Sequence, residues 1–336
     1  MTFTITRHLP QDATAAVLRA DVLSGLTGTT KTLPPKWFYD AHGSDLFEQI
    51  TTLPTYYATR AEQELLVARA GDIAEATGAR TLIELGSGSS TKTRHLLDAL
   101  PGLHTYIPVD VSESALRDAG TVLVQERRDL PVQALIADFT HRLTLPTTPG
   151  PRLVALFGST IGNLLPAQRL EFYACVRTLL EPGDALLLGV DLVKDPAVLV
   201  AAYDDQAVTG AFNKNVLTVI NRELGADFDL DAFKHVAIWD AEHEWIEMRL
   251  RSRTAQTVKI RDLDLAVDFA AGEDLRTEIS AKFRLPGLAN ELRCSGLALA
   301  RWFTTPAQLV GMALATPALS GTSSTAAIGR STACVR

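Results

Sequence analysis

The sequence predicts an α/β protein, with a doubly wound parallel sheet and a second, smaller α+β unit. Short apolar runs alternate with helix-like segments through the middle of the chain, and two stretches outside this alternation carry a different pattern. Apolar strands separated by helices indicate a parallel sheet that is covered on both faces. Right-handed crossovers then make the sheet doubly wound.

Five apolar runs are expected to form the parallel strands, because each is short and bounded by turn or helix-start signals. They span residues 81–86, 105–111, 132–139, 152–159 and 184–192. Helix spacing is found in three of the intervening segments, 87–100, 112–126 and 166–180. Ser112 is placed to act as an N-cap, and Pro166 suits the first turn of a helix.

Two regions do not follow this alternation. The first 60 or so residues look helix- and turn-like, and residues 196–284 hold a helical part and then antiparallel-looking strands. Within them, 243–260 alternates well enough for a strand pair. The later runs 297–304 and 309–316 resemble two final strands that return to the parallel sheet as a closing hairpin.

These patterns predict two units in one chain. The first comprises residues 61–195 plus 287–319, and the second comprises residues 1–60 plus 196–286. Residues 320–336 are rich in Ser, Thr, Gly and Ala and nearly uncharged, so we expect a disordered tail.

The composition narrows the function classes. Hydrophobic residues make up 46% of the 336 residues and charged residues 21%, which excludes wholesale disorder. Lys and Arg number 32 against 39 Asp and Glu, so nothing favours a nucleic-acid or anionic-membrane partner. No apolar run approaches the roughly 18 residues of a membrane span, and the N-terminus lacks a secretory pattern. Three distant cysteines suggest a reducing compartment. We expect a cytoplasmic monomer. We also expect no metal, because the seven histidines show no ligand spacing.

A glycine turn stands where the first parallel strand meets its helix. Gly86 and Gly88 lie in the run ELGSGSSTK, where glycines allow a tight turn and let backbone amides approach a ligand. Thr91 occupies the third glycine position of G-x-G-x-x-G, which disfavours a dinucleotide, and P-loop spacing is absent. A plain strand-to-helix turn remains the alternative.

An acid ends the second strand. Asp110 lies 24 positions beyond Gly86, close to the spacing of a ribose-hydroxyl acceptor, although a helix-start aspartate is equally common there. The joint pattern of E-x-G-x-G, strand and Asp matches the S-adenosylmethionine-binding arrangement of Rossmann-like methyltransferases. In that arrangement Gly86 and Gly88 face the amino-acid end of the cofactor, and Asp110 faces the ribose.

Three further residues fit the same cofactor. Asp138 and Phe139 follow the third strand and would flank the adenine, with a carboxylate for its amine and an aromatic edge for its ring. Lys92 could reach the cofactor carboxylate. Core packing is the alternative for Phe139, and a solvated lysine in the first helical turn is the alternative for Lys92.

Long segments of the chain resemble a known family. LPPKWFYDAHGSDLFEQITTLPTYY, IELGSGSSTKTRHLL, FGSTIGNLLP, GVDLVKD, AFNKNVL, NRELGADFDLDAF and TEISAKF are similar, in matched order, to the histidine-specific Nα-methyltransferases of ergothioneine biosynthesis. The similarity runs from about residue 30 to about residue 284 and is weaker beyond. It implies transfer of three methyl groups from S-adenosylmethionine to the α-amine of L-histidine, giving hercynine.

The resemblance also implies the residues of the site. Those for the cofactor match Gly86, Lys92, Asp110, Asp138 and Phe139. Those for histidine match Tyr56, Asn163, Tyr203, Glu278 and Ser280, with Tyr39, Phe47 and Met248 near the substrate. Tyr56 and Asn163 are the catalytic candidates. Tyr56 would lie near the reacting amine, and deprotonation by water or before binding would serve as well.

The implied residue types suit a histidine ligand. Glu278 and Ser280 alternate along an expected strand and would share one face, where a carboxylate and a hydroxyl recognise the two ring nitrogens. Asn163 and Tyr203 would donate to the substrate carboxylate, and Tyr39 and Phe47 would stabilise a quaternary ammonium. Taken singly, these residues also fit turn, packing and surface roles.

Three other functions stay open. One is Nα-methylation of another aromatic amino acid such as tryptophan, which the glutamate at position 278 disfavours. Another is a non-catalytic S-adenosylmethionine-binding regulator. The third is a nicotinamide-dependent dehydrogenase, which the missing third glycine disfavours.

Overall fold

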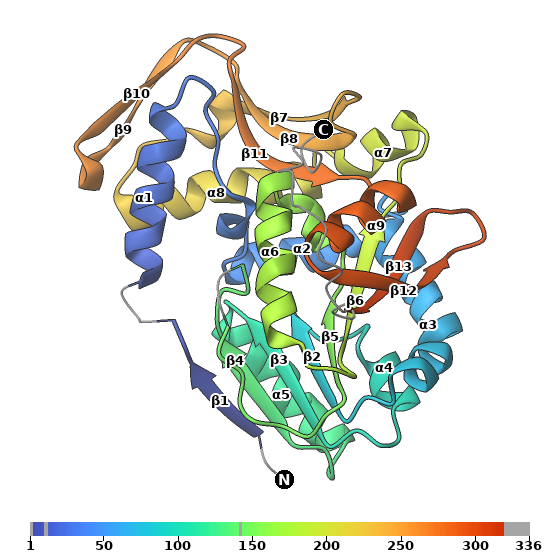
Figure 1. Ribbon diagram of the computed structural model, residues 1–336. Coiled ribbons are helices and arrows are strands. Elements are labelled where there is room, and N and C mark those ends of the chain that lie inside the picture. The colour runs from blue at the N-terminus through green and yellow to red at the C-terminus, as the bar shows by residue number, and fades with distance from the viewer. Residues whose placement is uncertain (1–2, 10–12, 141–142, 319–336) are drawn as a thin grey trace, which may run out of the picture.

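The computed structural model describes residues 3–9, 13–140 and 143–318. Within them, one large sheet has eight strands, of which β13 runs antiparallel to its neighbours β6 and β12 (Figure 1). The strands in spatial order are β1 (Phe3–Arg7), β4 (Val132–Ile136), β3 (Thr105–Asp110), β2 (Thr81–Leu85), β5 (Arg152–Leu156), β6 (Ala185–Asp191), β13 (Val310–Pro317) and β12 (Leu297–Thr304). The order in which strands are added to the sheet reverses between the parallel strands β2 and β5. In such sheets, ligands bind in the crevice at the carboxyl ends of the two strands.

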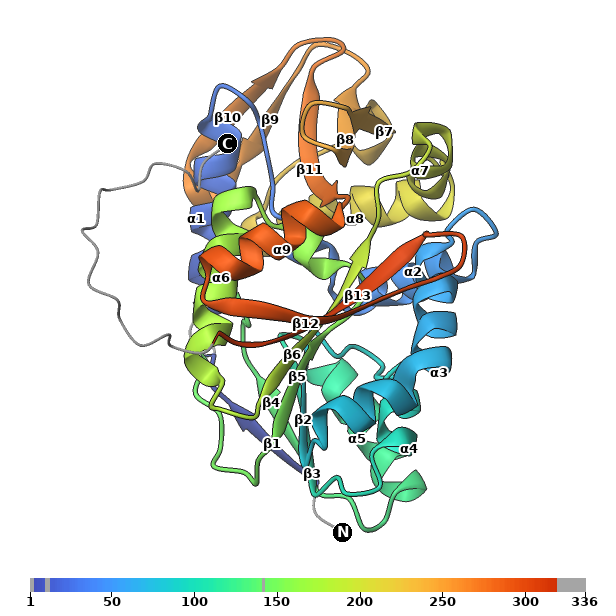
Figure 2. The same cartoon turned by 45° about the vertical axis from the view of Figure 1, so that its right-hand side comes forward.

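Helices cover both faces of this sheet (Figure 2). On one face lie α3 (Ala58–Thr77), α4 (Arg94–Ala99) and α5 (Glu113–Glu126), and on the other lie α6 (Pro166–Leu179) and α9 (Leu285–Cys294). Each face has its own apolar core. Leu66 and Leu96 belong to the first core, and Phe172 and Leu288 belong to the second.

A second group of elements lies above the carboxyl ends of the parallel strands (Figure 1). Its helices are α1 (Ala13–Thr27), α2 (Ala41–Thr52), α7 (Pro196–Tyr203) and α8 (Val208–Leu224), with short 3-10 turns η1 (Pro35–Phe38), η3 (Leu230–Ala232) and η4 (Arg261–Leu263). Its strands are β7 (Phe233–Asp240), β8 (Trp245–Ser252) and β11 (Asp274–Ala281), plus the hairpin β9 (Gln256–Ile260) and β10 (Leu265–Phe269). These elements share a separate apolar core, which includes Phe38, Phe212 and Ile246.

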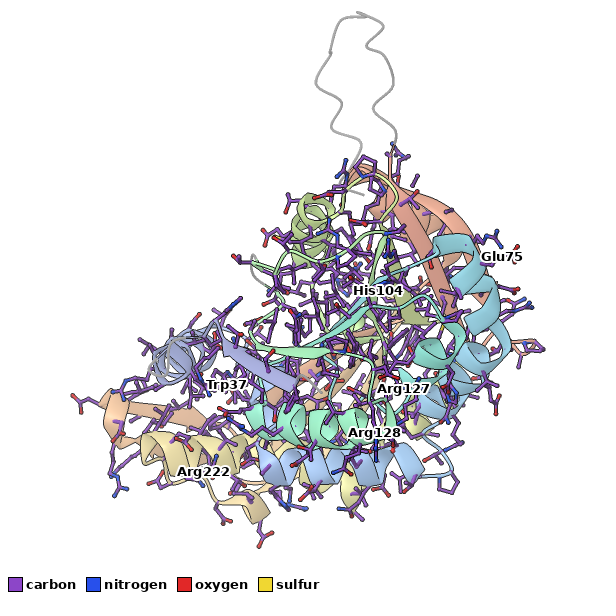
Figure 3. All side chains as sticks on the ribbon, turned by 90° about the horizontal axis from the view of Figure 1, so that it is seen from below. Trp37, Glu75, His104, Arg127, Arg128 and Arg222 are labelled. Carbon is purple, nitrogen blue, oxygen red and sulfur yellow. The ribbon has the colours of Figure 1, made fainter. Side chains whose placement is uncertain are left out.

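Polar contacts fix the N-terminal helices of this group. The Asp40 carboxylate caps α2 by accepting from the Gly43 amide at 2.8 Å, and Arg222 of α8 donates to it at 2.8 Å. Trp37 of η1 donates from its indole nitrogen to Asp21 of α1 at 3.0 Å. Figure 3 labels Trp37 and Arg222 on this side of the molecule. The contacts hold the segment that carries Tyr39 and Phe47 in a fixed position.

The predicted parallel strands, the closing hairpin and the two helix starts are confirmed. Each observed parallel strand ends one to three residues earlier than predicted, because the last residues of each run turn out of the sheet. Ser112 accepts from the Ala115 amide at 3.3 Å, and Pro166 begins α6. The predicted tail, residues 320–336, lies outside the described residues.

The structure differs from the sequence pattern at two places. Residues 3–7, which lie in the helix- and turn-like N-terminal region, form β1 and pair in parallel with β4. Phe3 explains the docking, because its ring packs so closely on Gly120 of α5 that a Cβ there would lie 2.2 Å away. The strands predicted as a pair in 243–260 both exist, yet β8 pairs with β7 and β11 while β9 pairs with β10. The unit boundaries themselves stay a prediction.

Candidate active site

A cavity of about 1350 Å³ lies where the carboxyl ends of the parallel strands meet the second group of elements. A pocket for one small ligand usually measures about 300–1,000 Å³, so this cavity has room for two. Every site residue that the sequence predicted lines it: Tyr39, Phe47, Tyr56, Gly86, Gly88, Lys92, Asp110, Asp138, Phe139, Asn163, Tyr203, Met248, Glu278 and Ser280. Their individual roles stay predictions.

Asp110 is held rigidly beside the glycine turn. Its Oδ2 accepts from the Gly88 amide at 3.0 Å, and its Oδ1 accepts from the Ser112 amide at 2.9 Å. Burial raises the pKa of Asp110, while the hydrogen bonds from the Ser112, Gly88 and Val111 amides act against that rise. The carboxylate keeps an acceptor position, so the side chain suits a ribose hydroxyl.

The turn itself leaves space for a ligand. Gly86 and Gly88 adopt φ values of +65° and +48°, which favour glycine. A Cβ on Gly86 would lie 3.2 Å from the Phe139 ring, so the missing side chain keeps this wall open. Among the described residues, the buried Ser87 hydroxyl has no hydrogen-bond partner, which fits a polar ligand at the turn.

Asp138 and Phe139 complete this end of the cavity. Asp138 Oδ1 accepts from the Thr140 amide at 2.9 Å and from the Thr140 hydroxyl at 2.5 Å. These bonds leave Oδ2 available as an acceptor. The ring of Phe139 packs edge to face against that of Phe172, with ring centroids 6.3 Å apart. Phe139 also lines the cavity.

Lys92 has a protein partner that the sequence did not reveal. Its ammonium pairs with Glu62, a buried carboxylate on α3 that also accepts from the Gly158 amide at 2.8 and 2.9 Å. The predicted reach of Lys92 to a cofactor carboxylate would therefore start from an existing ion pair. Glu62 lies in an ordinary helix sequence, RAEQELL, with no local motif to single it out.

Glu84 stabilises the glycine turn through hydrogen bonds to neighbouring elements. Its carboxylate accepts from Thr93 at 2.5 Å and from the Tyr106 hydroxyl, so it joins β2 to β3 and to the start of α4. Burial raises the pKa of Glu84 to about 7, although both hydrogen bonds favour the ionised form. The first residue of the E-x-G-x-G pattern thus contacts protein groups on both sides.

One wall of the cavity is aromatic. The rings of Tyr39 and Phe47 lie 5.6 Å apart, those of Phe47 and Tyr56 6.4 Å, and those of Tyr56 and Tyr203 6.0 Å, all edge to face. Met248 of β8 is buried beside them. Burial raises the pKa of Tyr56 well above its usual value, which favours the neutral phenol.

Glu278 reaches the cavity from β11, where it stands opposite Met248 of β8. Burial raises its pKa to about 7, while the Lys282 ammonium and a hydrogen bond from Asn163 act against that rise. Asn163 also donates from Nδ2 to the Ile279 carbonyl at 2.8 Å. One amide hydrogen of Asn163 is thus directed at β11, and its Oδ1 remains available to a ligand.

Ser280 and Tyr203 meet at the base of the same wall. Their hydroxyl oxygens lie 2.9 Å apart, and Lys282 Nζ donates to Ser280 at 2.8 Å and to Tyr203 at 3.0 Å. Lys282 is fully buried and pairs with Asp191 at 2.9 Å. Asp191 and Lys282 fall in the segments GVDLVKD and TEISAKF, which carried the resemblance without suggesting a role for either residue.

One further cavity residue escaped the sequence analysis. Thr209 of α8 lines the cavity with a buried hydroxyl that has no hydrogen-bond partner in the described part of the chain. Across the same described residues, no three His, Cys, Asp or Glu side chains gather as a metal site would require. No helix there combines the length and apolarity needed to cross a bilayer.

Comparison with known proteins agrees with this geometry. A family model described as histidine-specific methyltransferase, SAM-dependent, matches residues 18–317. The histidine N-alpha-methyltransferase of Mycolicibacterium smegmatis is 54% identical over 94% of this chain and 99% of its own length. The protein of the same name from Mycobacterium tuberculosis is 51% identical with the same coverage. A 4-dimethylallyltryptophan N-methyltransferase of Penicillium roqueforti is 30% identical over 56% of this chain and 59% of its own. This chain is therefore a member of the histidine-specific, S-adenosylmethionine-dependent methyltransferase family.

Proposed function

We propose that the protein transfers three methyl groups from S-adenosylmethionine to the α-amine of L-histidine, giving hercynine for ergothioneine biosynthesis. One observation carries the proposal. The carboxylate of Glu278 and the paired hydroxyls of Ser280 and Tyr203 line the same cavity as Asp110 and the glycine turn. A histidine ring and a ribose can therefore be bound in one cavity.

The cofactor end is built from groups with unused acceptor positions. Asp110 would receive the ribose hydroxyls, Asp138 Oδ2 would receive the adenine amine, and Phe139 would lie along the ring. Gly86 leaves the backbone open to the amino-acid end. When bound, S-adenosylmethionine would supply a methyl group on a positively charged sulfur. A neutral amine can attack this methyl carbon in line, and the sulfur then leaves as a neutral thioether. The protein contributes alignment and exclusion of water.

The histidine end is built from polar groups of β11. Glu278 would accept a ring N–H, and the Ser280–Tyr203 pair would meet the other ring nitrogen. The sequence analysis gave Asn163 and Tyr203 to the substrate carboxylate, but Asn163 donates to the Ile279 carbonyl and the Tyr203 hydroxyl lies 2.9 Å from that of Ser280. Asn163 Oδ1 therefore suits an N–H of the α-amine. Leaving Glu278 without a partner would cost about 1–3 kcal/mol, which disfavours apolar side chains.

The amine must be neutral to react. Tyr56 remains protonated, so we assign it a hydrogen-bonding place beside the amine and assign no base. Deprotonation by water before the methyl transfer is sufficient. The faces of Tyr39 and Phe47 would stabilise the quaternary ammonium product.

A second candidate is Nα-methylation of a tryptophan-like amino acid. The similarity to a 4-dimethylallyltryptophan N-methyltransferase and the aromatic wall of the cavity favour it. Glu278 speaks against it, because an indole would leave one of the two polar positions without a partner. A binding-only regulator and a dehydrogenase have no such observation in their favour.

The test incubates pure protein with S-adenosylmethionine and each amino acid separately, and follows product mass. We expect a mass gain of three methyl groups on histidine, and no comparable gain on tryptophan. Absence of methylated histidine would overturn the proposal. Thermal stabilisation by S-adenosylmethionine without turnover on any amino acid would favour the regulator, and stabilisation by NAD would favour the dehydrogenase.

We propose in addition that a cytoplasmic monomer carries out this reaction. The proposed cofactor and histidine residues line one cavity within a single chain, which supports the proposal of a monomer. We expect light scattering to give the mass of one chain. The specific activity should not change with protein concentration.

A further inference from the structure

A buried ammonium lies directly behind the proposed ring-binding groups. Lys282 Nζ is within 2.9 Å of Asp191 Oδ2, 2.8 Å of Ser280 Oγ and 3.0 Å of Tyr203 Oη. Its side chain is fully buried, and so is that of Asp191. An ammonium has three hydrogens to donate, and all three have acceptors here. Lys282 thus makes no direct contact with a ligand in the cavity.

Counting hydrogens shows what this ammonium does to the two hydroxyls. Ser280 and Tyr203 lie 2.9 Å apart, so one of them donates to the other. The receiving oxygen then accepts twice, from Lys282 and from its neighbour, and has no acceptor position left. Its own hydrogen remains without a protein partner. The pair therefore offers a ligand one hydroxyl donor at that oxygen, while the other oxygen, which donates to its neighbour and accepts from Lys282, keeps one acceptor position.

We infer that Lys282 is a positioning residue that turns the Ser280–Tyr203 pair into a fixed hydrogen-bond donor toward the unprotonated ring nitrogen of the substrate. This inference rests on the proposed function. Glu278 accepts at one ring nitrogen, and the hydroxyl pair donates at the other. The site therefore selects a neutral imidazole in one orientation. Without the ammonium, both hydroxyls could rotate and accept instead, and the orientation would be lost.

The same ammonium acts on Glu278 through its charge. Lys282 opposes the burial that raises the pKa of Glu278 to about 7. The other titratable groups coupled to Glu278 are the phenols of Tyr39, Tyr56 and Tyr203, and burial raises the pKa of Tyr56 and Tyr203 well above the usual value. Replacement of Lys282 by a neutral side chain should raise the pKa of Glu278 further.

The experiment compares two lysines that share one carboxylate. Lys194 also pairs with Asp191, at 2.5 Å, but its remaining partners are the Tyr57 hydroxyl and the Leu192 carbonyl. Lys194→Met therefore removes a cation from Asp191 without touching the hydroxyl pair. Lys282→Met removes the other cation and the two donors. Steady-state kinetics with histidine and calorimetric titration with S-adenosylmethionine are measured for both variants and the wild type.

We expect Lys282→Met to raise KM for histidine about tenfold to a hundredfold, with a smaller change in kcat and an unchanged affinity for S-adenosylmethionine. The acid-side break in the pH dependence of kcat/KM should move to higher pH. Lys194→Met should change KM and the break little. Lys282→Arg keeps the charge but directs a planar guanidinium at three converging acceptors. The acid-side break in the pH dependence of kcat/KM should therefore stay where it is, while KM should still rise.

Equal effects of the two methionine variants on KM would show a structural role and overturn the inference. So would an unchanged KM in Lys282→Met. If Lys282→Met does not fold, a wild-type KM in Lys282→Arg would overturn it. These results are distinct from failure of the proposed function, because that failure appears as absent histidine turnover in the wild type, and the inference then falls with it.

Discussion

Asn163 donates a hydrogen bond to the carbonyl of Ile279 over 2.8 Å, and this contact joins the loop after β5 to the strand that carries Glu278. The Phe283 amide adds a bond to the Asp191 carbonyl at 2.8 Å, just beyond the end of β11. The wall proposed for the histidine ring is therefore attached to the sheet edge proposed for the cofactor. Such attachment fixes the distance between two bound reactants, which in-line transfer requires.

A mutation of Glu278 should affect histidine turnover but not cofactor binding. Glu278→Ala should lower kcat/KM for histidine by about two orders of magnitude or more, because the ring loses its acceptor and the hydroxyl pair alone cannot orient it. The affinity for S-adenosylmethionine should survive, since Asp110 and the glycine turn belong to β3 and to the end of β2, not to β11. Kinetics and calorimetry measure the two quantities. Parallel loss of both would contradict the assigned role.

The pH dependence of histidine turnover should report the ionisation of Glu278. Burial raises its pKa to about 7, so the carboxylate acceptor is lost as the pH falls through that value. The profile of log kcat/KM should therefore steepen below about pH 7, in addition to the slope from the substrate amine. In Glu278→Gln this extra steepening should disappear. An identical profile shape in wild type and variant would rule out Glu278 as the titrating group.

Gly86 should be needed for the cofactor and not only for the turn. Gly86→Ala places a Cβ against the Phe139 ring and strains a φ of +65°, whereas Gly78→Ala strains a φ of +52° with no atom within 4 Å. Both variants should lose about 1–2 kcal/mol of stability from the left-handed backbone. We expect a weaker S-adenosylmethionine affinity in Gly86→Ala alone. Similar affinities in the two variants would refute a ligand-facing Gly86.

Glu84 should make the free energy of unfolding depend on pH. Its folded-state pKa of about 7 exceeds the ordinary value of 4.5, so the folded protein binds more protons than the unfolded chain between these values. Stability should fall as the pH rises from about 4.5 to 7, by up to about 3 kcal/mol from this group. Glu84→Gln should flatten that part of the profile in urea denaturation. A slope unchanged by the substitution would exclude Glu84 as its source.

The sequence could predict the parts of the molecule that depend on local pattern. Apolar runs and helix starts gave the strands of the parallel sheet, and Asp110 followed from its spacing after Gly86. Strand β1 was missed because five residues at a chain end carry little pattern, and its position depends on Phe3 packing over Gly120. Only the folded structure relates these distant segments.

The candidate site divides in the same way. Glu278 and Ser280 came from a resemblance, and the structure places both on the cavity wall. The partners behind them, Lys282 and Asp191, lie 91 positions apart in sequence and meet as a buried ion pair. Glu62, which holds Lys92, is equally invisible in its helix. Long-range charge pairing inside a protein has no local sequence signal.

A structure of the protein with histidine and S-adenosylhomocysteine would test the central claim most directly. The account predicts the imidazole between Glu278 and the Ser280–Tyr203 pair, the α-amine toward Asn163, and the ribose hydroxyls on Asp110. A ring stacked on Tyr39 and Phe47 instead, with Glu278 making no contact to the ligand, would contradict it.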